Sequence, residues 1–131
     1  MLSRERLRDA RLLLTKGRYV GAYYLAGYAV ECALKACIAR QTREHDFPDK
    51  KTAIESHTHD LEKLIGVARL KPQLDAASAA DKAFEVNWSL VEDWAVEDRY
   101  NLNISVVDAK NLYRAISAKK SGVMAWIRRH W

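Results

Sequence analysis

The sequence predicts an all-α fold, an antiparallel bundle of about five helices. Apolar residues make up 49% of the 131 residues, and only two are proline and five glycine. That composition suits helices and argues against disorder. Apolar residues also recur at intervals of three and four along much of the chain. Residues 19–39 form an apolar run interrupted only by Glu31 and Lys35, which is typical of a helix buried on nearly all sides. At this length we expect one domain, residues 1–131.

The first two helices are expected over about residues 3–16 and 18–42. Ser3 is the candidate N-cap of the first helix. Glu31 and Lys35 in the second are four apart with the acid first, the spacing at which helical side chains meet, so we predict a structural ion pair. Gly21 and Gly27 each cost about 1 kcal/mol relative to alanine inside a helix. We infer that another backbone approaches this helix closely there, within the bundle or across a dimer.

In the rest of the chain we expect a polar loop over about residues 43–57, followed by a third helix over 58–71 and a fourth over 72–95. An irregular segment is expected over about residues 96–104, and a last helix from residue 105 or 108 onward. Thr58 is the candidate N-cap of the third helix. Trp94 departs from the apolar stripe of the fourth helix, so we take it as the best candidate for an interface.

The second helix is long enough to span a bilayer, which takes about twenty residues. Glu31 and Lys35 lie toward its middle, however, and charges there oppose insertion. We therefore expect a buried helix of a soluble bundle and no contact with a membrane.

The net charge of +5 is concentrated at the two ends of the chain. Residues 1–18 carry six basic and two acidic groups, and residues 110–131 carry six basic groups and no acid. Such ends favour contact with phosphates. The alternative is that these charged residues only form solvent-exposed helix faces.

Two short motifs carry a family resemblance. Residues 29–36 read AVECALKA, and residues 59–61 read HDL. They resemble the HEPN domain family (higher eukaryotes and prokaryotes nucleotide-binding domain), whose members carry an A-x-E-x-x-L-K-A helix and then an H-D-L helix. With the last helix, the resemblance covers most of the chain. It implies a HEPN-like bundle, a small stand-alone bacterial member that forms a homodimer and binds RNA or nucleotides.

The resemblance also implies a toxin-like protein paired with a minimal nucleotidyltransferase. Many family members are metal-independent ribonucleases with an R-x(4–6)-H signature before the last helix, in which His moves a proton and Arg stabilises phosphorane charge. The arginine at that place is Arg99, but Ile104, Ser105 and Val106 stand where the histidine would be. The signature is incomplete, and the sequence leaves open whether the chain is an enzyme.

The candidate site residues follow from this comparison. For ligand binding they are Arg99, Tyr100, Lys110 and Arg114. The catalytic residues are unknown, with Arg99, His59 and His45 as candidates. One alternative function is a metal-independent ribonuclease that uses His59 or His45, although the match from Arg40 to His45 lies in the wrong place for the family. The other is a non-enzymatic dimeric protein-interaction module.

Metal and cofactor sites are not expected. His57 and His59 form an H-x-H pair, but a metal would need a further ligand such as Asp60, His45 or Asp46.

Cys32 and Cys37 would lie about 7.5 Å apart along one helix, too far for a disulfide. Two reduced thiols predict a cytoplasmic protein.

Overall fold

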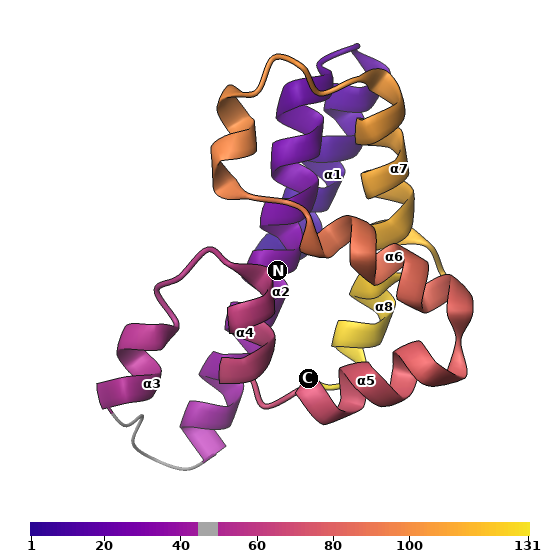
Figure 1. Ribbon diagram of the computed structural model, residues 1–131. Helices are drawn as coiled ribbons and strands as arrows, with labels where there is room; N and C mark the ends of the chain where they lie inside the picture. Colours follow the sequence, from indigo (N-terminus) through magenta and orange to yellow (C-terminus); the bar gives the residue numbers. More distant parts are fainter. Residues whose placement is uncertain (45–49) are drawn as a thin grey trace.

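The computed structural model describes residues 1–44 and 50–131, and within them the regular elements are all helices (Figure 1). The predicted all-α bundle is therefore confirmed. The elements are α1 (Leu2–Thr15), α2 (Tyr19–Glu44), α3 (Lys50–Glu55), α4 (Leu61–Val67), α5 (Lys71–Ala80), α6 (Lys82–Glu92), the 3₁₀ helix η1 (Val96–Tyr100), α7 (Val106–Ser117) and α8 (Val123–Arg128).

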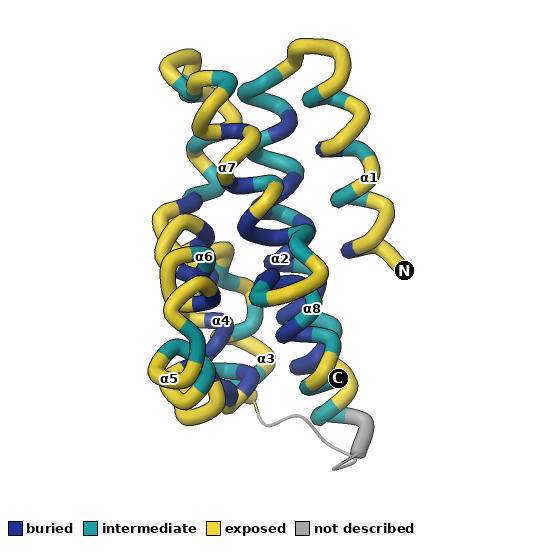
Figure 2. The backbone as a smooth tube through the Cα atoms, turned by 90° about the vertical axis from the view of Figure 1, so that its right-hand side faces the viewer, coloured by how far each residue is buried: buried dark blue, intermediate teal, exposed yellow. Residues whose placement is uncertain are grey.

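The long helix α2 lies at the centre, and α1, α4, α7, α8 and η1 all pack against it. Figure 2 shows buried residues along much of its length. Small residues such as Ala26, Ala29 and Ala33 are fully buried there, which lets the surrounding helices approach closely. Within the described residues, no helix has both the length and the apolar character needed to cross a bilayer.

Two predicted helices are each broken in the structure, and the two breaks are joined. Asp81 separates α5 from α6 because its backbone is extended and its carboxylate accepts from the N–H groups of Ala83 and Phe84, at 3.0 and 3.3 Å. The last predicted helix ends at Ser117 and resumes at Val123, after Ser121 adopts a φ of +65°. The Ser121 hydroxyl donates to the Asp81 carboxylate at 2.5 Å. Each break therefore stabilises the other.

Three local expectations were wrong. The first helix begins at Leu2, so Ser3 is not its N-cap but lies buried in the first turn. The third predicted helix begins at Leu61, capped by Asp60 rather than Thr58, because the Asp60 carboxylate accepts from the Lys63 N–H at 3.1 Å. Part of the predicted loop is the short helix α3.

The region around Gly27 also differs from the expectation. A Cβ at Gly27 would come within 2.3 Å of the Trp94 indole ring, so a side chain, not a backbone, makes the close approach. Trp94 is only 3% exposed. It lies beyond the end of α6 and packs in the core instead of at an exposed interface.

Candidate functional site

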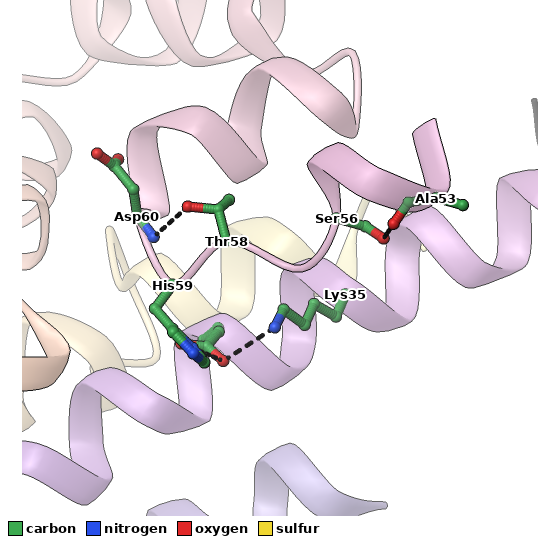
Figure 3. A network of polar contacts seen from close by, with 7 residues as sticks. Lys35, Ala53, Ser56, Thr58, His59 and Asp60 are labelled. Atoms are coloured by element: carbon green, nitrogen blue, oxygen red, sulfur yellow. Dashed lines mark hydrogen bonds and ion pairs between the residues drawn. The ribbon is translucent and has the colours of Figure 1, made fainter. Parts of the chain in front are cut away.

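A buried carboxylate joins α2 to the turn that precedes α4. The Glu31 side chain is 3% exposed, and Lys35 Nζ lies 3.2 Å from its Oε2 atom. His59 Nδ1 lies 3.0 Å from both Glu31 carboxylate oxygens. Figure 3 shows Lys35 and His59 converging on this network from the two elements. A charge this deeply buried requires such partners, so the network fixes the position of His59.

The chemistry open to His59 follows from that geometry. Its side chain is 53% exposed, so the ring is held at Nδ1 while part of it remains open to solvent. A carboxylate that orients a histidine in this way is one element of general acid–base sites. The backbone N–H of Asp60, which donates to Thr58 Oγ1 at 3.1 Å, further fixes the turn that carries His59.

The groove beside His59 is acidic. It has a volume of about 680 Å³ and is lined by His59 together with the carboxylates Asp60, Glu62, Glu92, Asp93 and Glu97. Burial raises the pKa of the Glu92 carboxyl, and the neighbouring acids Glu62 and Asp93 raise it further. A groove of this charge repels the phosphates of RNA.

Arg99 and Tyr100, at the end of η1, form an exposed cation–aromatic pair. The Arg99 guanidinium carbon lies 4.7 Å from the centre of the Tyr100 ring, and Tyr100 is 72% exposed. Interactions with the Tyr24 and Tyr100 side chains raise the pKa of Arg99. The Asp98 carboxylate accepts instead from the Ala95 N–H at 2.9 Å. Among the described residues, Arg99 forms no ion pair with an acid.

A chain of packed rings connects this pair to the core. The Trp94 indole lies against Gly27 and stacks on Tyr24, with ring centres 6.1 Å apart. Tyr24 in turn interacts with Arg99. Sequence reasoning missed Tyr24, because its neighbourhood to Arg99 depends on how η1 packs against α2.

Lys110 and Arg114 lie elsewhere. Both are exposed on α7, one helical turn apart, and are therefore neighbours on the helix surface. Figure 1 shows η1 to the left of α2 and α7 to its right. The structure therefore does not bring the four ligand-binding candidates together. It gives two separate pairs.

The remaining candidate residues from the sequence add little to a functional site. His45 lies outside the described residues. Within the described residues, no group of three or more His, Cys, Asp or Glu side chains is arranged to hold a metal ion. Cys32 and Cys37 are free thiols.

Tyr23 occupies a second acidic hollow, of about 320 Å³, between α2, α6, η1 and α7. Burial raises the pKa of its hydroxyl from 10.0 to about 12, and Asp98, Asp108 and Asp93 add to the shift. The neutral Tyr23 hydroxyl therefore stabilises the folded state, and this contribution is fully present below the unfolded pKa of 10.0. It is lost as the pH rises through the folded pKa of about 12. Stability should fall over this window.

Tyr23→Phe should reduce that alkaline loss, because phenylalanine has no proton to release. Denaturant unfolding of both proteins at several pH values checks this. Between about pH 7 and 9 the two should show the same pH dependence, since a tyrosine remains protonated there. An equally steep alkaline loss in both proteins would contradict the assignment.

With this geometry in hand, the family is clear. The family model of the HEPN domain matches residues 3–121. The chain therefore belongs to the HEPN family, which confirms the resemblance in residues 29–36 and 59–61. No curated protein and no solved structure was found that matches the chain. Family membership supports a role related to nucleotides or RNA.

Proposed function

We propose that this HEPN protein binds RNA or nucleotides at the Arg99–Tyr100 pair. The observation that carries the proposal is an exposed arginine stacked on an exposed tyrosine, without an acidic partner in the described residues. Arginine pairs with phosphate through its planar fork of donors. Bases of single-stranded RNA stack on aromatic rings and on guanidinium planes. The pair therefore offers both kinds of contact in one place.

Lys110 and Arg114 belong to the proposal as contacts to the phosphate backbone. They are exposed and one turn apart on α7, a spacing that suits successive phosphates better than a single base. We further propose that residues 1–131 form one HEPN-like domain, which acts in the cytoplasm as a homodimer. In this proposal its partner protein is a minimal nucleotidyltransferase, and the chain is the toxin-like member of the pair.

The ribonuclease alternative draws support from one observation, the contact of His59 with Glu31. The groove that His59 faces is acidic, however, and the arginine of the signature lies in η1 without its histidine. Because this acidic groove repels RNA, its charge argues against cleavage at His59 and favours a function in which RNA is bound elsewhere.

Arg99→Ala should raise the Kd for a short labelled single-stranded RNA about tenfold, the loss expected for one charged hydrogen bond. Helicity by circular dichroism should not change, because the Arg99 side chain is exposed. Tyr100→Leu should weaken binding similarly, since stacking is worth about 1–3 kcal/mol per base. Fluorescence anisotropy measures both.

Lys63→Ala is the control, because it removes one positive charge from the exposed surface of α4. It should leave the Kd within about twofold, as expected for a distant surface charge. Unchanged affinity in Arg99→Ala contradicts the site. Cleavage of the probe in the presence of chelator would favour the ribonuclease instead. Salt-independent binding of a partner protein, with no affinity for the RNA probe, would favour a protein-interaction module, because phosphate contacts are steeply salt-dependent.

A further inference from the structure

The two basic ends of the chain meet on one side of the bundle. Helix α1 packs against α2 and α7, and α8 packs against α7 and α2. Figure 2 shows α1 at the outside of the bundle, with an exposed face along much of its length. Between α1, α7 and α8 lies a groove of about 310 Å³, lined by Arg4, Leu7, Arg8, Arg11, Tyr113 and Arg128. We call this set the arginine groove.

Among the described residues, no carboxylate lines the arginine groove. The two acids of α1 are already engaged, since Glu5 pairs with Arg8 at 2.7 Å and Asp9 pairs with Arg6 at 3.3 Å. Among the described residues, the other three arginines of the groove form no ion pair. The groove therefore holds several positive charges that this part of the chain leaves uncompensated.

Arg128 is the least satisfied of these side chains. Its Nε atom is buried and has no hydrogen-bond partner among the described residues. Burial lowers the pKa of the guanidinium, and the charge of Arg4 lowers it further. A basic side chain in the last turn of a helix commonly bonds the terminal carbonyls. The adjacent Arg129 does this, with Nε donating to the Ala125 carbonyl at 3.4 Å, whereas Arg128 Nε does not.

We propose that the arginine groove binds a phosphate group. Guanidinium groups present paired donors that match phosphate oxygens, and an anion placed among Arg4, Arg11 and Arg128 would relieve their mutual repulsion. The volume suits a phosphate with a small attached group, at the lower end of ligand pockets. The Tyr113 side chain adds a polar hydroxyl and an apolar ring to the wall.

The groove is distinct from the Arg99–Tyr100 pair, and the proposal does not depend on that pair. Arg128 lies beyond residues 3–121, so the family match says nothing about it. Lys110 stands three residues before Tyr113 on α7, where helical side chains are neighbours. The basic surface therefore continues from the groove toward Lys110 and Arg114. Either a terminal phosphate or a backbone phosphodiester would supply the required chemistry.

Titration of the purified full chain with pyrophosphate, and with one oligoribonucleotide carrying either a 5′-phosphate or a 5′-hydroxyl, tests the proposal. Arg128→Gln should weaken binding of at least one probe about tenfold, the effect of one charged hydrogen bond. Arg4→Gln, at an exposed position, should weaken the same probe and provides a second test if Arg128→Gln folds poorly. The matched control Arg129→Gln removes the neighbouring charge and should stay within about twofold.

The probes separate the two sources of phosphate. Preference for the 5′-phosphorylated strand assigns the groove to a terminal phosphate, and equal binding of both strands that still depends on Arg128 assigns it to the backbone. An effect of Arg128→Gln and Arg4→Gln without any effect of Arg99→Ala on RNA affinity means that the proposed function alone fails, and the reverse pattern means that this site alone fails. Binding of every probe that is equal in wild type, Arg128→Gln and Arg4→Gln, or no binding of any probe, overturns the proposal.

Discussion

Replacing Gly27 with alanine should lower the free energy of unfolding by about 2 kcal/mol. The added Cβ would lie 2.3 Å from three atoms of the buried Trp94 ring. For so large an overlap we expect a cost at the upper end of the range usual for overpacking, about 3 kcal/mol. Alanine is favoured over glycine in a helix by about 1 kcal/mol, which offsets part of that cost. Denaturant unfolding followed by circular dichroism measures the net change.

Gly66→Ala is the matched control, because Gly66 also lies in a helix and a Cβ there would meet no described residue within 4 Å. It should gain up to about 1 kcal/mol from helix propensity alone. The two substitutions are therefore expected to have opposite signs. Destabilisation by both, or by neither, would contradict the packing of Trp94 on Gly27.

The same substitution has a functional readout. Trp94 stacks on Tyr24, and Tyr24 interacts with Arg99, so displacing the indole should disturb the segment that carries Arg99 and Tyr100. Gly27→Ala is therefore expected to weaken RNA binding as well as stability, whereas Gly66→Ala should leave binding unchanged. A glycine in the core would then act as a positioning residue for an exposed pair.

Local spacing was sufficient to predict some of this arrangement. The distance of four residues between Glu31 and Lys35 depends only on helix geometry, and the structure places their charged atoms 3.2 Å apart. Apolar periodicity likewise predicted the all-α class and the long central helix. The breaks at Asp81 and Ser121 were missed, because the hydrogen bond that joins them spans forty positions in the sequence. A capping aspartate alone did not indicate that a helix stops there.

The contacts that matter most for the site are those that periodicity does not encode. His59 meets Glu31 only because the turn before α4 packs on α2. Trp94 was taken for an interface residue because its position off the apolar stripe of the predicted fourth helix gave no sign of a glycine opposite it. The basic ends were recognised from composition, but their convergence in one groove depends on α1 lying beside α7 and α8.

Lys35→Met should destabilise the protein by about 2–3 kcal/mol, because it leaves the buried Glu31 carboxylate without its permanent cation. Breaking a fully buried pair costs about 3–5 kcal/mol. The expected value is lower because the Lys35 side chain is 33% exposed and His59 still contacts the carboxylate. Lys71→Met is the matched control. Lys71 and Asp75 have the same spacing and lie 3.1 Å apart, but their side chains are 58% and 64% exposed. Such a pair contributes about 0–1 kcal/mol.

A double-mutant cycle separates the cost of the stranded charge from the loss of packing. Glu31→Gln removes the charge while keeping the shape, so we expect it to cost about 1–2 kcal/mol through weakened hydrogen bonds. In the Glu31→Gln, Lys35→Met double variant no buried charge is left unpaired, so its cost should fall below the sum of the single variants by about 1 kcal/mol or more. Additive costs would mean that Lys35 contributes through its alkyl chain alone. In that case the Glu31–Lys35 pair of α2 would not stabilise the bundle electrostatically. The position of His59 would then depend on packing of the turn before α4.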